Sequence, residues 1–220
     1  MSRTEVVRDY GGRSADTRRD ERRRKLLTAA RQIWGESGIG QVTVRGVCTA
    51  AGLTPRYFYE HFTDREKLIV QVAEDARTEV LDLLVGTSLA TPGRLRPKLL
   101  AALTALFELL ATDRTLHRIV ADWATAEPLV QMRNETLDQL TELVLTHGTG
   151  LLDIDLPGAA DIRRGALFTV GGVSMVLDHW LRDPTESAPD LARQCTNLCL
   201  AAINGFGAPD PRPSTPVDNT

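Results

Sequence analysis

Apolar residues recur at three- and four-residue intervals along most of this chain, and this helical spacing restricts the possible folds most. The stripe on the first predicted helix, which starts at Arg18, consists of Leu26, Leu27, Ala30, Ile33 and Trp34. The later segments with this spacing are about 64–85, 94–111, 114–125, 127–147, 159–181 and 188–206. The sequence contains no alternating run long enough for a half-buried β-strand. We therefore predict an all-α fold.

Composition and charge divide the chain into unequal parts. Residues 1–17 lack apolar periodicity and are expected to form a flexible arm, and the proline-rich residues 207–220 a disordered tail. Between them we predict a helix-turn-helix domain over 18–67 and a larger helical bundle over 68–206. Residues 1–67 carry 14 Lys and Arg against 9 Asp and Glu, whereas the rest carries 12 against 20. This asymmetry indicates that the first domain meets a polyanion.

Two short helices are predicted on either side of a glycine-containing turn in the basic domain. Thr43 is a credible N-cap of the first helix, which extends through Ala51, and Gly52 closes it in the C′ position. Thr54 caps the second helix, a proline follows in its first turn, and the helix is predicted to end near Phe62. Two short helices joined in this way inside a basic region are typical of the helix-turn-helix motif.

In such a motif the N-terminal residues of the second helix lie at the base edges of the major groove. Arg56 lies there and can form a bidentate pair with guanine, and Arg45 can reach a base edge or a phosphate. Hydroxyl and imidazole groups suit phosphate oxygens, although His61 can instead cap or pack. The next helix starts with Arg65 and Lys67, where backbone amides favour an anion. The candidate DNA-binding residues are Thr43, Arg45, Thr54, Pro55, Arg56, Tyr57, Tyr59, His61, Arg65 and Lys67.

The segment TVRGVCTAAGLTPRYFYEHFTDREKL, preceded by LLTAARQIWGESGIGQV, resembles the DNA-binding domain of the TetR family of one-component bacterial repressors. The resemblance covers residues 20–72 and rests on the AAGLT turn, the YFYEHF block and the DREKL segment. The positions that it implies to lie at or near DNA are Thr43, Arg45, Thr54, Arg56, Tyr57, Tyr59, His61 and Arg65. Arg56 stands where the family often has a small residue, which favours an operator preference of its own.

The resemblance also implies that the C-terminal bundle binds a small, mostly apolar effector and joins two copies of the chain. The helices predicted at 159–181 and 188–206 carry wide apolar faces, which suit either a four-helix dimer interface or an intramolecular core. Bulky residues on apolar helical faces are the candidates for lining an effector pocket, with core packing as the alternative for each. They are Phe107, His117, Trp123, Met132, Phe168, Met175, His179 and Trp180.

Motifs of other function classes are missing from the sequence. It has no Walker loop, HExxH or CxxC, and the histidines are not at metal-ligand spacing. We therefore expect no enzyme activity, no metal and no cofactor. The three cysteines follow no disulfide framework and no N-terminal apolar run is present, which favours a cytoplasmic protein. Cys195 and Cys199, four residues apart, are either buried apolar residues or a redox pair.

The prediction from the sequence is a ligand-responsive transcriptional repressor that binds a palindromic operator as a dimer and is released by its effector. The alternative is a DNA-binding regulator or architectural protein without a small-molecule effector. A filled bundle without any cavity would favour this alternative. Activation in place of repression stays open.

Overall fold

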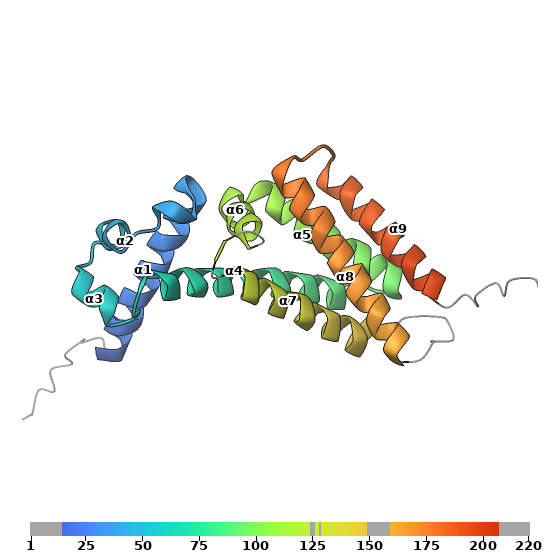
Figure 1. Ribbon diagram of the computed structural model, residues 1–220, viewed down its shortest axis with the longest axis horizontal. Helices are drawn as coiled ribbons and strands as arrows, with labels where there is room; N and C mark the ends of the chain where they lie inside the picture. The colour runs from blue at the N-terminus through green and yellow to red at the C-terminus, as the bar shows by residue number, and fades with distance from the viewer. Residues whose placement is uncertain (1–14, 124–125, 128, 149–158, 207–220) are drawn as a thin grey trace, which may run out of the picture. The chain divides into compact units, whose positions relative to one another are not determined.

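The computed structural model of the protein describes residues 15–123, 126–127, 129–148 and 159–206, and these residues form helices connected by short turns (Figure 1). The predicted disordered tail and residues 1–14 of the predicted arm lie outside the described residues. No strand occurs in the described part of the chain, and the predicted all-α fold is confirmed. Internal contacts divide the chain into two compact units, Met1–Val72 and Ala73–Thr220.

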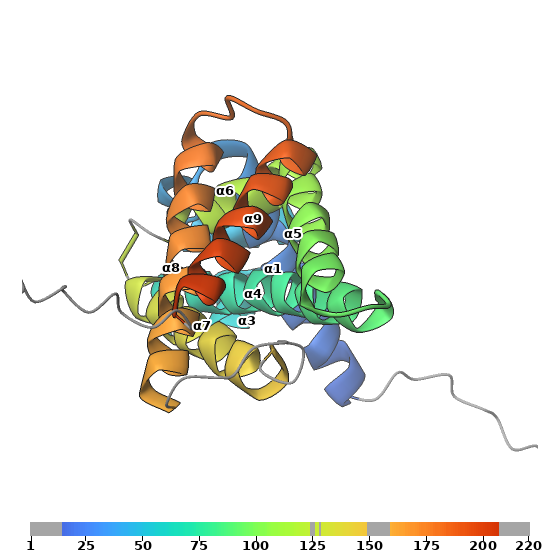
Figure 2. The ribbon, with the colours of Figure 1, turned by 90° about the vertical axis from the view of Figure 1, so that its right-hand side faces the viewer.

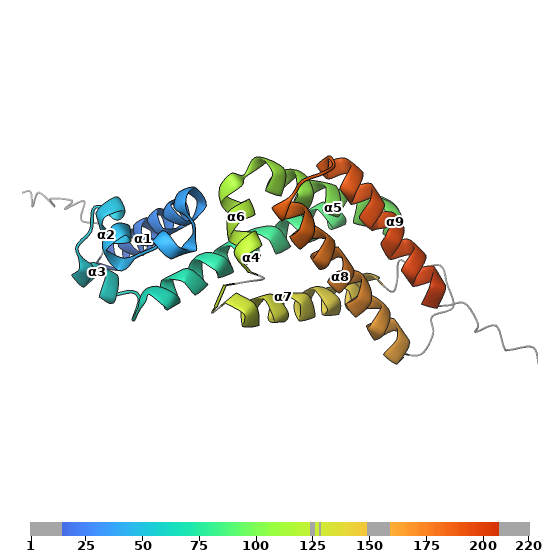
Figure 3. The ribbon, with the colours of Figure 1, turned by 45° about the horizontal axis from the view of Figure 1, so that its top comes forward.

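The first unit is a small helical domain. Its elements are α1 (Ala15–Ser37), the 3-10 turn η1 (Ile39–Gln41), α2 (Val44–Ala51), α3 (Pro55–Tyr59) and the start of α4 (Arg65–Ala90). Contacts join α1 to α2 and α3, and α2 to α3 (Figures 1 and 3). The buried side chains at its centre include Leu26, Ala30, Trp34, Val42, Val47, Phe58 and Phe62.

The first helix starts at Ala15, three residues before the predicted start at Arg18, so residues 15–17 of the predicted flexible arm are helical. Asp16 lies in the first turn, where a carboxylate is stabilised by the positive end of the helix dipole. Residues 16–20 are exposed. Apolar periodicity marks only the part of a helix that packs, so it gave no signal for these residues.

The second unit is a helical bundle. Its elements are the rest of α4, α5 (Leu95–Thr112), α6 (Arg114–Asp122), α7 (Leu129–Leu143), the π-helical turn η2 (Val144–Gly148), α8 (Ala159–Arg182) and α9 (Ala188–Phe206). Helix α9 lies between α5 and α8 (Figure 2), and both α6 and α7 contact α8. None of the described helices is long and apolar enough to cross a membrane.

The ends of α4 and α3 are among those that differ from the predicted ones. Helix α4 continues past the predicted end at Val85 to Ala90, since an internal glycine costs only about 1 kcal/mol and Lys98 binds carbonyl groups at its C-terminal end. Helix α3 ends at Tyr59 instead of near Phe62. The backbone amide of His61 donates to the carbonyl oxygen of Phe58, a three-residue step that turns the chain out of the helix.

Candidate functional site

Local chemistry explains the turn between α2 and α3. The hydroxyl oxygen of Thr43 accepts a hydrogen bond of 3.1 Å from the backbone amide of Gly46, which confirms the predicted N-cap. Gly52 ends α2 with a φ of 65°, the left-handed conformation that glycine adopts without a steric penalty. Thr54 occupies the N-cap position of α3 without a side-chain hydrogen bond, and Pro55 is the first helical residue. The two helices form a helix-turn-helix.

Helix α3 has an inward and an outward face of different chemistry. The Phe58 side chain is fully buried, and its ring centroid lies 5.7 Å from that of Phe62, as the spacing of four predicts. On the outward side, Tyr59 is 61% exposed and the side chain of Arg56 is 87% exposed. The inward rings therefore fix the helix, while the outward face offers a guanidinium and a phenol to a ligand in solvent.

Most of the predicted DNA-binding side chains lie on the surface of the first unit. The exposed ones are Thr43, Arg45, Thr54, Pro55, Arg56, Tyr59 and Lys67. Tyr57 is half-buried, and the guanidinium of Arg22 lies over its ring at 4.7 Å from the centroid. His61 is also half-buried, and burial together with the nearby Arg19 lowers its pKa. The lowered pKa favours the neutral imidazole, which can donate a hydrogen bond to a phosphate.

Arg65 has a structural role that the sequence analysis did not assign to it. Its Nε donates to the carbonyl oxygen of Val42 at 2.5 Å, and its Nη2 donates to that of Ile39 at 2.6 Å. Nη1 lies 3.6 Å from the carboxylate of Glu66. These contacts join the start of α4 to the segment before α2. The half-buried guanidinium therefore links the two chain segments that flank the helix-turn-helix.

Glu60 is a further residue of this surface that the sequence analysis missed. Its carboxylate lies 3.6 Å from Nε of Arg56 and 3.7 Å from Nη2 of Arg22. The spacing of four between Arg56 and Glu60 is the available sequence signal, because such residues are neighbours on a helix. The carboxylate of Glu60 therefore pairs with two arginines of this surface, one on α3 and one on α1.

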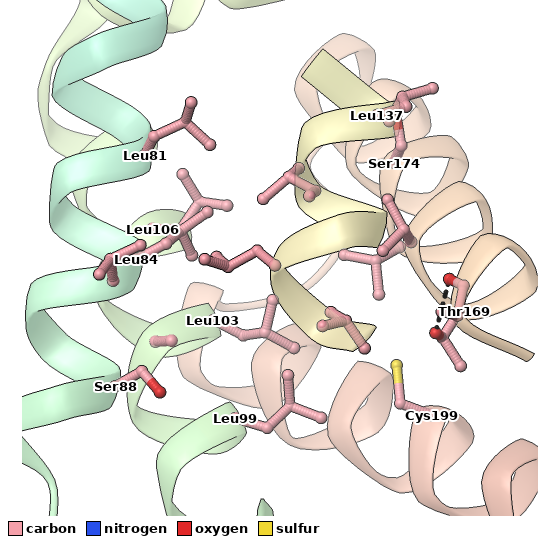
Figure 4. Close-up of a pocket in the computed structure, with 18 of the residues that line it drawn as sticks. Leu81, Leu84, Ser88, Leu99, Leu103, Leu106, Leu137, Thr169, Ser174 and Cys199 are labelled. Atoms are coloured by element: carbon pink, nitrogen blue, oxygen red, sulfur yellow. Dashed lines mark hydrogen bonds between the residues drawn. The ribbon is translucent and has the colours of Figure 1, made fainter. Parts of the chain in front are cut away.

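The second unit contains a cavity of about 370 Å³, a size within the range of small-molecule pockets, about 300–1,000 Å³. Helices α4 to α9 all contribute to its wall, which consists mainly of Leu, Val, Ile and Ala side chains. Leu81, Leu84, Leu103 and Leu106 are among them, and Figure 4 shows these side chains around the open space. No cluster of His, Cys, Asp and Glu able to hold a metal ion occurs among the residues that the structure describes. The wall suits an apolar molecule.

Charged groups lie at two places in the cavity wall. Arg133 on α7 donates through Nη2 to Asp178 at 2.7 Å and to the hydroxyl of Ser174 at 3.1 Å, both on α8. Lys98 on α5 donates to the carbonyl oxygen of Ser88 at 3.0 Å, near the end of α4. Figure 4 shows Ser174 and Ser88 on opposite sides of the cavity. The apolar cavity therefore has polar residues on two opposite sides.

The structure places most of the predicted pocket residues away from this cavity. Trp123 lines it. Phe107 and Trp180 are buried against each other, with ring centroids 5.9 Å apart, and Met132 is buried. The ring nitrogens of His117 lie 3.2 and 2.9 Å from backbone carbonyl oxygens of α5 and α8, a packing role. The exposed ones are Phe168, Met175 and His179. Bulky side chains fill the space between helices, so the cavity remains where smaller ones meet.

Cys199 lines the cavity from α9 (Figure 4), and burial raises the pKa of its thiol to about 11. Cys195 is buried one helical turn earlier, and its pKa is raised as well, first by burial. Neither thiol forms a disulfide bond. A thiol with a raised pKa is a poor nucleophile at neutral pH, so the buried environment favours the apolar interpretation of this pair over the redox one.

The raised pKa predicts that the bundle loses stability at alkaline pH. The folded state binds the Cys199 proton more tightly than the unfolded chain, whose thiol has a pKa near 9.0. This contribution is complete below pH 9.0 and is lost as the pH rises toward about 11. Urea unfolding on both sides of this window measures the loss, and we expect Cys199→Ala to reduce it. An identical loss in the variant would assign it to other groups.

Comparison with known proteins agrees with these observations. The sequence profile of "Bacterial regulatory proteins, tetR family" matches residues 26–72, which contain α2 and α3. The HTH-type transcriptional activator FasR of Mycolicibacterium smegmatis is 25% identical over 201 residues, 86% of each chain. Among solved structures, SmeT, the repressor of the Stenotrophomonas maltophilia multidrug efflux pump SmeDEF, is 22% identical with a TM-score of 0.66, over 87% of this chain and 97% of SmeT.

A second solved structure is that of FadR from Bacillus subtilis, in complex with stearoyl-CoA. It is 18% identical with a TM-score of 0.63, over 82% of this chain and 98% of FadR. At these identities the structures show a shared fold, and the profile match adds the DNA-binding motif. The chain therefore carries the DNA-binding domain of the TetR family of transcriptional regulators, as the resemblance of its helix-turn-helix segment predicted.

Proposed function

We propose that this regulator is a ligand-responsive repressor whose dimer binds a palindromic operator and leaves it when a small, mostly apolar effector binds. The observation that carries the proposal is the apolar cavity of about 370 Å³ in the unit that follows the helix-turn-helix. An architectural protein without an effector has no use for such a space, which would be more stable if filled. The cavity therefore favours the ligand-responsive function over the alternative.

Recognition of the operator is assigned to the outward side of α3 and to α2. Arg56 lies in the first turn of α3 with its side chain 87% exposed, so it can reach the O6 and N7 atoms of a guanine. Arg45 on α2 and Tyr59 on α3 are exposed and suit contacts with the DNA backbone. A dimer is proposed because two such motifs are needed to read the two halves of a palindrome.

Release is assigned to α4, the helix common to both parts of the chain. It starts in the first unit at Arg65, and six of its residues between Val80 and Leu89 line the cavity. An effector that favours a different position of this helix changes the spacing of the two motifs in the dimer. By linkage, saturating operator DNA must then weaken effector binding by the same factor. The stearoyl-CoA in the FadR structure makes acyl compounds the first effectors to test.

Replacing Arg56 by alanine is expected to weaken binding to the operator by about fivefold to 150-fold, the value of a bidentate contact with guanine, with little effect on random DNA. The measurement is fluorescence anisotropy with the DNA upstream of the gene, at two salt concentrations. Lys67→Ala is the matched control, because Lys67 is exposed and is expected to contact phosphates. Its loss should lower the affinity for all DNA sequences alike and reduce the salt dependence of binding. If the Arg56 variant instead loses the same affinity for all DNA sequences, Arg56 contacts phosphates and not base edges.

The sign of regulation needs a separate measurement, since FasR is a transcriptional activator and SmeT a repressor. We expect the purified protein to lower transcription from its own upstream DNA in vitro. Addition of an effector that fills the cavity should restore transcription. Higher transcription on adding the protein would contradict repression while leaving DNA recognition intact.

A further inference from the structure

The two cationic side chains in the cavity wall have different partners. Arg133 forms an ion pair with Asp178 at 2.7 Å, and these side chains are only 22% and 13% exposed. Lys98 has no carboxylate within ion-pair distance in the described part of the chain. Its partners are the backbone carbonyl oxygens of Ser88 and Thr91, at 3.0 and 2.7 Å. The charge on one side of the cavity is thus matched, and the charge on the other side is not.

The carbonyl groups do not neutralise Lys98. The carbonyl end of a helix carries only about half a negative charge, so it offsets the full charge of the ammonium only in part. The two carbonyl oxygens accept two of the three N–H groups of the ammonium, and one donor is left. Both the remaining charge and the remaining donor lie in the wall of a cavity that is otherwise mainly apolar. An electrostatic interaction there is stronger than the same interaction in water.

We propose that the effector is an amphiphile with a single carboxylate, whose apolar body fills the cavity and whose carboxylate pairs with Lys98. This inference rests on the proposed function, because it names the chemical class of the effector of that cavity. The uncharged end of the molecule lies toward Arg133, whose charge Asp178 already matches. Ser88 and Cys199 also line the cavity, and neither carries a negative charge at neutral pH that would repel a carboxylate.

Other effector classes fit this wall less well. A neutral apolar molecule would cover the ammonium without supplying a counter-charge, which is unfavourable for a charged group. A cationic amphiphile would meet a charge of the same sign. A coenzyme A thioester carries several phosphates, whereas the lining residues offer one unmatched cation. An amphiphile with a free carboxylate therefore matches the charge of the cavity wall most closely.

The test compares three probes with the same alkyl chain, dodecanoate, dodecanol and dodecyltrimethylammonium, by titration calorimetry on the full-length protein. We expect dodecanoate to bind most tightly and added salt to weaken dodecanoate more than dodecanol. Lys98→Met should weaken dodecanoate by about tenfold or more and leave dodecanol unchanged, because a hydrogen bond to a charged group is lost. Lys98→Arg should retain most of the affinity. Arg96→Met is the matched control. Arg96 is exposed on α5 and does not line the cavity, so the substitution removes the same charge outside the cavity wall.

Equal binding of dodecanoate and dodecanol by the unaltered chain would overturn the inference. This comparison needs no variant, so it tests the inference even if Lys98→Met folds poorly. Equal losses of both probes in the variant would overturn it too, as would tight binding of dodecanoyl-CoA without binding of dodecanoate. Operator affinity is measured separately with each probe. Lys98-dependent binding of dodecanoate that leaves operator affinity unchanged would support the carboxylate assignment and contradict the proposed function.

Discussion

Alanine in place of Phe58 is expected to remove about 3–5 kcal/mol from the stability of the helix-turn-helix unit and to abolish operator binding. Phe58 is fully buried, and its ring contacts that of Phe62. Helix α3 has five residues, too few to stay helical without packing. Because small domains are stable by only about 5–15 kcal/mol, the loss is a large share of the total. Hydrogen exchange of the amides in 44–62 measures the change directly.

Tyr59→Phe is the matched control for this prediction. Tyr59 is the next residue of the same helix, but it is 61% exposed, and the substitution removes only its hydroxyl. We expect unchanged hydrogen exchange and a severalfold, sequence-independent loss of DNA affinity, about the value of one hydrogen bond to a phosphate. Normal exchange and normal operator binding in Phe58→Ala would contradict the assignment of this ring to the core of the unit.

The helix-turn-helix was predictable because its geometry depends on local chemistry. A hydroxyl at Thr43 can cap only a helix that starts beside it, a glycine at Gly52 is needed for the left-handed turn, and a proline at Pro55 suits the first turn of a helix. Each requirement involves residues within a few positions of each other. The inward face of α3 followed for the same reason, from the spacing of four between its two phenylalanines.

The role of Arg65 was not predictable, because its partners are distant in the sequence. The carbonyl groups that it binds belong to residues 23 and 26 positions earlier. Nothing in the spacing of residues distinguishes an arginine that binds a loop from one that binds DNA. The same limit applies to Glu60, which meets Arg22 only because α1 packs against α3.

The cavity could not be predicted from bulky residues, because a large side chain on an apolar face usually fills the core. Phe107 and Trp180 pack against each other, whereas the cavity wall consists mainly of leucine and valine from several helices. A better signal was present in the sequence. Lys98 and Arg133 are single cations on otherwise apolar helical stripes, and both prove to line the cavity. A lone charge on an apolar stripe needs a partner, and the partner can be a ligand.

Aspartate in place of Met175 is expected to prevent dimer formation and to lower operator affinity by about 100-fold or more, the gain that joining two binding modules provides. Met175 on α8 and Leu198 on α9 are 62% and 64% exposed, and Phe168, seven residues before Met175 on the same helical face, is 65% exposed. Helices α8 and α9 contact each other, so these side chains belong to one pair of packed helices. Exposed apolar groups of this size indicate an interface, and a carboxylate among them would lose its hydration in a dimer.

Val130→Asp is the control for this prediction, since Val130 is 37% exposed on α7 and receives the same new charge outside the proposed interface. Analytical ultracentrifugation and anisotropy with the operator should show a dimer and nearly normal affinity for the control. The Met175 variant should sediment as a monomer and still bind a single half-site, because its proposed DNA-binding residues Arg45 and Arg56 are unchanged. If it stays a dimer with full operator affinity, the dimer interface lies elsewhere, and the exposed side chains of α8 and α9 need another partner.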